Sequence, residues 1–114
     1  MHEAMVAQSV LAAISSEAAK HHGRPVEAKI SCGRLYAIND DALCFAFDAL
    51  ARGTPCEDVK LRIEHKPIQG RCTKCRHEFD LENPSDKCRK CGSDDFELLP
   101  DPPLLLEEIE FDTE

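Results

Sequence analysis

The sequence of 114 residues has no long hydrophobic run, few aromatic residues and no Lys or Arg after Gly92. A membrane-spanning helix needs roughly 18–20 consecutive apolar residues, and no stretch approaches that length. The first residues also lack the basic patch and the small-residue cleavage site of a secretory signal. We therefore expect a cytoplasmic protein without a membrane partner.

Common catalytic signatures are missing as well. There is no Gly-rich phosphate loop, no G-x-S-x-G turn and no H-E-x-x-H helix. The formal net charge is -8, and residues 93–114 carry nine acids, which we expect to form a solvated face. Nucleic-acid binding requires clustered Lys and Arg, and residues 70–92 also lack interleaved aromatic side chains for base stacking. The sequence therefore predicts no enzyme, and it disfavours a nucleic-acid partner.

Hydrophobic periodicity predicts two helices and three strands. Residues 3–22 and 39–53 have apolar side chains at helical spacing, whereas residues 26–32 and 59–66 alternate between apolar and polar. Residues 104–111 form a further short apolar segment suited to a strand. In the first helix the apolar stripe is Val6, Val10, Ala13 and Ile14. In the second helix the expected buried face is Leu43, Ala46, Phe47 and Leu50, widened by Cys44 and Phe45.

Residues 71–92 are rich in Cys, Lys and Arg and have too few apolar side chains for a core of their own. The last strand is expected to return to the sheet of the first part. We therefore predict an α+β fold. Residues 1–69 plus 100–114 would form a small sheet of about three strands flanked by two helices. Residues 70–99 would form an inserted, zinc-ribbon-like domain.

Four of the seven cysteines are spaced as metal ligands. Cys72 and Cys75 form one C-x2-C pair, and Cys88 and Cys91 form a second pair after twelve intervening residues. Two such pairs complete a tetrahedron of thiolates, which suits Zn(II) and leaves no open position for catalysis. Two disulfides are the alternative, but a reducing compartment disfavours them. His77 is a further candidate group beside this metal, although a solvated loop histidine is the simpler interpretation.

The start of the sequence is a second candidate metal site. A free amine at Met1 would titrate near 7.7–8.0, so it is available as a ligand near neutral pH. His2 adds an imidazole, and the backbone amides of His2 and Glu3 lie beside it. A square plane of nitrogens suits Ni(II) or Cu(II) rather than zinc. A frayed terminal histidine without a ligand role is the alternative.

The whole pattern resembles the HypA/HybF family of nickel metallochaperones. The resemblance rests on "MHE", "CGRL", "ALCFAFDALARGT", "LRIEHKP", the two CxxC pairs and "LLLEEIEF", in this order. It implies a nickel-binding domain with Met1, His2 and Glu3 at the ion, and a zinc domain with the four paired cysteines as ligands. The implied partners are the nickel-handling GTPase HypB, the [NiFe]-hydrogenase large subunit and a urease accessory protein.

One departure concerns a carboxylate that the family often has six residues after the turn glycine. Counting from Gly33, this chain has Asn39, followed by Asp40. Asp40 is therefore the candidate carboxylate near the nickel. The alternative to a nickel carrier is a zinc-ribbon module that binds protein or nucleic acid.

The remaining Cys and His residues are expected to be structural. Cys32 and Cys44 fall on apolar faces and should be core thiols. Cys56, in a loop, should be exposed and oxidisable. His65 falls on the inward phase of its strand, where we expect a buried and hydrogen-bonded ring.

Overall fold

The computed structural model describes residues 3–82 and 86–112. These residues form two α-helices and two three-stranded sheets, an α+β fold as the sequence predicted. The first part contains α1 (Glu3–Ala18), β1 (Arg24–Gly33), α2 (Asp40–Ala51), β2 (Lys60–Lys66) and β6 (Leu105–Asp112). The second part contains β3 (Ile68–Cys72), β4 (Glu78–Leu81) and β5 (Phe96–Leu98). Among the described residues, no helix is long and apolar enough to cross a membrane.

The first sheet has the strand order β2-β1-β6. β1 and β2 are parallel, and the connection between them contains α2, as parallel neighbours require. β6 pairs with β1 in the antiparallel direction, with Ala28 opposite Ile109. The prediction that the last segment returns to the first sheet is therefore confirmed.

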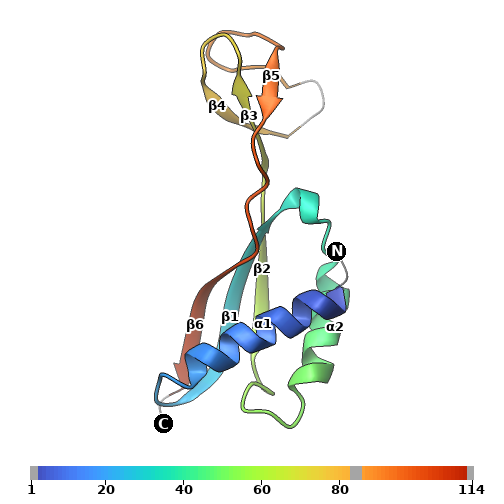
Figure 1. Cartoon of the computed structure of the whole chain (residues 1–114), viewed down its shortest axis with the longest axis vertical. Coiled ribbons are helices and arrows are strands. Elements are labelled where there is room, and N and C mark those ends of the chain that lie inside the picture. Colours follow the sequence, from blue (N-terminus) through green and yellow to red (C-terminus); the bar gives the residue numbers. More distant parts are fainter. Residues whose placement is uncertain (1–2, 83–85, 113–114) are drawn as a thin grey trace.

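Both helices pack on one face of this sheet (Figure 1). Alternation along β1 buries Ala28, Ile30 and Cys32 beneath them. The helices contribute most of the other fully buried side chains, namely Val6, Ala7, Val10, Ile14, Leu43, Phe47 and Ala51. The predicted stripe of α1 is thus largely correct, except that Ala7 replaces the half-buried Ala13.

The second sheet has the order β4-β3-β5, and it has a small core of its own. The sequence-based expectation that this region lacks a core was wrong. Its buried cluster consists of Cys72, Phe79 and Cys88, and Phe79 packs edge-on against Phe96 with ring centroids 5.5 Å apart. The cysteine side chains supply apolar volume that a count of hydrocarbon side chains misses.

The two sheets lie at opposite ends of an elongated molecule of 54 × 26 × 16 Å (Figure 1). The short passage from β2 to β3 and the segment before β6 link them. The segment before β6 is fixed by a hydrogen bond, in which the Gly33 N–H donates to the Pro102 carbonyl at 2.9 Å.

Some predicted details were wrong. α1 ends at Ala18 rather than at residue 22, because the chain must turn through Gly23 (φ 96°) to enter β1. Phe45 is 77% exposed and Leu50 is 38% exposed, since α2 is covered on one side only.

The prediction for Cys56 was also wrong, because this thiol is fully buried. The turn after α2 folds back so that the Cys56 sulfur lies 3.6 Å from the Ser15 hydroxyl of α1. The predictions for the other two structural thiols fit better: Cys32 is fully buried and Cys44 is half-buried.

Candidate metal centre

The structure brings the four paired cysteines together at the far end of the second sheet. Their sulfurs all lie within 4.8 Å of one another, and the Cys72–Cys91 and Cys75–Cys88 sulfurs are 3.5 Å apart. Zn–S bonds of about 2.3 Å in a regular tetrahedron place sulfurs about 3.8 Å apart. The four side chains therefore fit zinc. Within residues 3–82 and 86–112 they are the one group of three or more Cys, His, Asp or Glu side chains arranged to hold a metal ion.

The backbone of the first knuckle is folded by two hydrogen bonds. The Cys72 N–H donates to the His77 carbonyl, and the Arg76 N–H donates to the Cys72 carbonyl, both at 2.9 Å. This tight turn places Arg76 in the left-handed region, with φ 63°. Both cysteines of the pair can then present their sulfurs to one point.

The second knuckle repeats this geometry. The Cys88 N–H donates to the Ser93 carbonyl at 2.9 Å, and the Gly92 N–H donates to the Cys88 carbonyl at 2.8 Å. Gly92 has φ 75° and occupies the position equivalent to Arg76. The first knuckle thus reaches, with an arginine, a conformation that glycine adopts at less cost.

The thiols of the cluster have displaced pKa values. Backbone N–H groups, first that of Cys75, lower the pKa of Cys72 to about 6. Burial raises the pKa of Cys88, but N–H donors led by that of Cys91 outweigh burial and lower it overall. The Ser93 N–H lowers the pKa of Cys91, yet the adjacent sulfurs and burial raise it to about 12. Backbone donors therefore favour the thiolate form at Cys72 and Cys88, the adjacent sulfurs oppose it at Cys91, and a divalent cation in the cluster would offset that repulsion.

His77 contributes to the centre through its backbone. Its carbonyl accepts the Cys72 hydrogen bond, while its exposed ring stacks on Phe79 with centroids 6.4 Å apart. A role of the imidazole beside the metal stays a prediction.

The proposed nickel residues Met1 and His2 lie outside the described residues. Glu3, the first described residue, contacts the start of α2, where its carboxylate accepts a hydrogen bond from the Asn39 N–H at 3.1 Å. Asn39 caps α2, because its side-chain oxygen accepts from the Ala42 N–H at 2.9 Å. The side-chain oxygen of Asn39 is therefore occupied by this helix cap.

Asp40, the next residue, has a partner that the sequence did not reveal. His65 Nε2 lies 2.6 Å from Asp40 Oδ1, so the predicted hydrogen bond of His65 is confirmed, with the candidate carboxylate as its partner, but the ring is only partly buried rather than buried as predicted. The His65 side chain is 29% exposed and that of Asp40 is 51% exposed. The sequence offered two separate signals, an inward-facing histidine near the end of a strand and an acid at the start of a helix, but nothing in it linked them.

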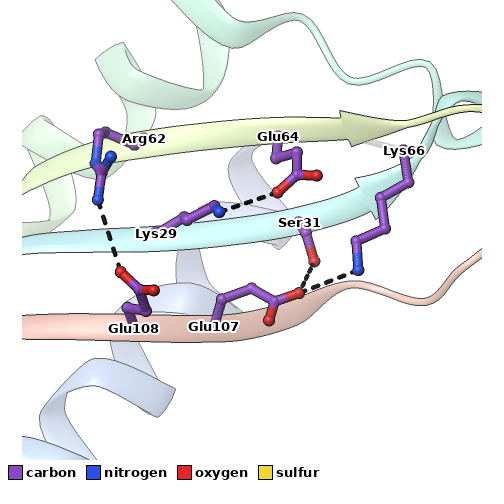
Figure 2. Close-up of polar contacts among 7 residues, drawn as sticks. All are labelled: Lys29, Ser31, Arg62, Glu64, Lys66, Glu107 and Glu108. Atoms are coloured by element: carbon purple, nitrogen blue, oxygen red, sulfur yellow. Dashed lines mark hydrogen bonds and ion pairs between the residues drawn. The ribbon is translucent and has the colours of Figure 1, made fainter.

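The face of the first sheet that the helices leave uncovered is charged. Figure 2 shows how its charges pair across the three strands through Lys29, Ser31, Arg62, Glu64, Lys66, Glu107 and Glu108. The buried Ser31 hydroxyl donates to Glu107 at 2.6 Å, and Lys66 lies 3.3 Å from the same carboxylate. Ser31 and then Lys66 lower the pKa of Glu107. Much of the acidic β6 is therefore balanced by bases of β1 and β2.

Comparison with known proteins identifies the family. A family model described as hydrogenase/urease nickel incorporation, metallochaperone, hypA matches residues 1–111. Hydrogenase maturation factor HypA of Desulfitobacterium hafniense is 37% identical over 111 residues, which are 96% of this chain and 97% of that protein. Hydrogenase maturation factor HypA of Geotalea daltonii is 37% identical over 100 residues, which are 87% and 88% of the two chains.

Solved structures share the fold. The solution structure of the Ni metallochaperone HypA from Helicobacter pylori matches over the full length of both chains, with a TM-score of 0.65 and 23% identity. A solution structure of HypA protein matches with a TM-score of 0.69 and 25% identity, covering 100% of this chain and 98% of that one. The similarity thus extends well beyond the four cysteines. The chain belongs to the HypA family of nickel-incorporation metallochaperones of hydrogenase and urease maturation.

Proposed function

We propose that this chain carries Ni(II) as cargo at its N-terminus and delivers it during [NiFe]-hydrogenase maturation. The ligands would be the Met1 amine, the His2 imidazole, and the backbone amides of His2 and Glu3. The observation that supports this most strongly is the family match over residues 1–111, which includes the "MHE" start. An all-nitrogen plane suits Ni(II), whereas a set of four thiolates suits zinc.

Delivery would proceed by ligand exchange. All the proposed ligands come from three consecutive residues, so the ion can be transferred stepwise to the thiolates of an acceptor. The partners would be the nickel-handling GTPase HypB and the hydrogenase large subunit, with a urease accessory protein as a further acceptor. We place the protein in the cytoplasm as a carrier rather than an enzyme.

The four cysteines would hold Zn(II) in a closed shell of thiolates. When bound, this metal neutralises thiolate charge and cross-links the two knuckles, which stabilises the small second sheet. The division into a nickel domain (residues 1–69 plus 100–114) and a zinc domain (residues 70–99) stays a prediction that accompanies this assignment. In this proposal the zinc has a structural role and the nickel is cargo.

The first test is His2→Ala, with His22→Ala as a matched control, because His22 is an exposed histidine just beyond α1. Calorimetric titration with NiCl2 should show stoichiometric binding by the wild type and the control, and none by His2→Ala. Zinc content and thermal unfolding should be equal in all three proteins. Undiminished nickel affinity in His2→Ala would contradict the proposal and favour a zinc-ribbon binding module.

The second test addresses the amine. Two extra residues before Met1 should weaken nickel binding severely without changing zinc content, because an amide nitrogen then replaces the free amine. Equal nickel affinity of extended and unextended protein would show that the amine is not a ligand.

A further inference from the structure

β6 forms an open edge of the first sheet. Within residues 3–82 and 86–112 it pairs with β1 alone, so the backbone N–H and C=O groups that point away from β1 have no strand beside them. Figure 1 shows β6 at one side of this sheet and β2 at the other, with α1 crossing the strands. The register with β1 shifts at Glu107, but residues 108–112 of β6 contain no extra residue. This regular stretch is a template on which a further strand can pair.

A groove of about 700 Å³ lies between α1 and β6. Its apolar lining includes Ala13 of α1 together with Ile109 and Phe111 of β6, whose side chains lie on the helix side of the sheet. Glu107 and Glu108 line the groove too, although they belong to the opposite, charged face (Figure 2). A groove that is lined from both faces of an edge strand extends along that edge, which is where an added strand would lie.

The charge along this edge has one sign. The ionisable side chains of β6 are all acids, namely Glu107, Glu108, Glu110 and Asp112. β2, at the other edge, contains three Lys or Arg residues and one Glu. Ion pairs across the sheet reach the first two acids, but none reaches the exposed Glu110 in the described part of the chain, where it lies opposite Glu27 in the register. Glu17 of α1 adds a carboxylate to the groove, so the site favours an occupant with Lys or Arg side chains.

The same charges disfavour a second copy of this chain as the occupant. Two copies pairing through β6 would place acids opposite acids, which is destabilising. Pairing of β6 with β2 of a second copy would gain little, because the bases of β2 are already used. Arg62 contacts Glu27 and Glu108, and Lys66 contacts Glu107, all within one chain.

We propose that the edge of β6 binds a basic, extended segment of another protein by strand addition. Lys or Arg side chains of this segment lie beside Glu108 and Glu110 on the uncovered face of the sheet. Its alternate, apolar side chains lie beside Ile109 and Phe111 in the groove next to α1. Main-chain hydrogen bonds to β6 supply affinity, and the alternation of basic and apolar side chains supplies specificity.

The test uses the full-length protein labelled with ¹⁵N and a heptapeptide of alternating Lys and Val (KVKVKVK). We expect saturable binding in an NMR titration, with the largest chemical-shift changes in residues 105–112 and slower hydrogen exchange at alternate amides of β6. Two control peptides should bind at least about tenfold more weakly. One has the same composition without alternation (KKVVVKK), and the other is the alternating peptide with every amide N-methylated.

Variants of the protein test the charge at the edge. Glu108→Lys/Glu110→Lys replaces two attractive cross-strand pairs by two repulsive ones, so it should weaken peptide binding by roughly tenfold or more. Asp48→Lys/Glu57→Lys makes the same change in net charge at exposed residues outside β6, and it should bind within about twofold of the wild type. Thermal unfolding of each variant shows whether it is folded.

A second pair of variants tests the groove. Ser16 is exposed on α1 and lines the groove, so Ser16→Trp should fill the space and weaken peptide binding by about tenfold. Ser9→Trp places the same side chain at an exposed position of the same helix outside the groove lining, and binding should be unchanged.

Equal binding of the three peptides, or wild-type affinity in Glu108→Lys/Glu110→Lys, would overturn strand addition and leave only unspecific charge attraction. Chemical-shift changes centred on β2 would overturn the assignment to β6. If the free protein self-associates in analytical ultracentrifugation and Ser16→Trp abolishes this, a second copy occupies the groove and the proposal of a separate basic partner is wrong. Nickel does not enter the experiment, so its outcome is independent of the His2→Ala test.

Discussion

Gly92 allows a direct test of the backbone geometry at the four-cysteine centre. It has φ 75° in the second knuckle, and a Cβ added there would meet no atom within 4 Å. Gly92→Ala therefore changes the conformational preference of the backbone without introducing a clash. A left-handed conformation costs an L-residue roughly 1–2 kcal/mol.

This cost should appear in zinc binding, because folding of the small second sheet and metal binding are coupled. At 1.4 kcal/mol for each factor of ten, we expect zinc affinity to fall roughly 5- to 30-fold in Gly92→Ala. Competition with a colorimetric chelator measures this change. Gly53→Ala is the matched control, because Gly53 has φ 80°, also with no atom within 4 Å, but it follows α2. It should lower the unfolding midpoint of the first unit and leave zinc affinity unchanged.

The first knuckle allows the opposite substitution, from a residue with a side chain to glycine. Arg76 has φ 63° at the equivalent position, so Arg76→Gly should relieve strain and tighten zinc binding. The gain should be about 1 kcal/mol at most, since glycine loses more conformational freedom on folding. Arg76→Ala removes the same charge but keeps the strain, so it should not tighten binding. If Gly92→Ala binds zinc as the wild type does, or if Arg76→Ala matches Arg76→Gly, the backbone explanation is refuted.

Three further predictions concern stability. Phe47→Ala should cost about 3–5 kcal/mol in denaturant unfolding while zinc affinity is unchanged, because this fully buried ring belongs to the first core only; a cost below about 2 kcal/mol would argue against that packing. Glu107 has a lowered pKa, so its stabilising contribution is present above the unfolded value of about 4.3 and is lost as pH falls through the folded value; unfolding measured from about pH 6 to pH 3 should be flatter in Glu107→Gln, and equal slopes would refute this. Both Asp101 carboxylate oxygens are buried without a hydrogen-bond partner in the described part of the chain, so Asp101→Ala should raise stability by about 1 kcal/mol, and a loss of stability would contradict this.

Most of the first sheet could be predicted from sequence because its signals are local. Alternation along β1 and β2 and helical spacing in α1 each depend on side chains a few positions apart. The extent of burial around α2 could not be predicted in the same way. Phe45 and Leu50 continue an apolar stripe, but only the packing against α1 decides which side of that stripe is covered.

The second sheet was missed for a different reason. Its core uses Cys72 and Cys88, which the sequence pattern assigned to the metal alone. A cysteine that binds a metal is also a small apolar side chain, and two of them beside Phe79 suffice for a minimal core. Cys56 was misjudged because nothing near it in sequence indicates that the turn after α2 folds back against α1.

The two candidate sites differed in how far sequence could define them. The four cysteines of the candidate metal centre come in two local pairs, and the spacing within each pair already lets both sulfurs meet one ion. The contact between Asp40 and His65 joins positions 25 residues apart. It depends on how β2 and the start of α2 come together in the folded chain, and no periodic pattern in the sequence encodes this.

The same contrast supports the proposal that one protein holds two metals for opposite purposes. A zinc ion held by four thiolates from two separate knuckles would leave only after all four were displaced, and the backbone hydrogen bonds of both knuckles would oppose this. The proposed nickel ligands instead belong to three consecutive residues, Met1, His2 and Glu3. These ligands could be displaced one after another by an acceptor without unfolding either sheet, because the strands of both sheets lie elsewhere in the chain.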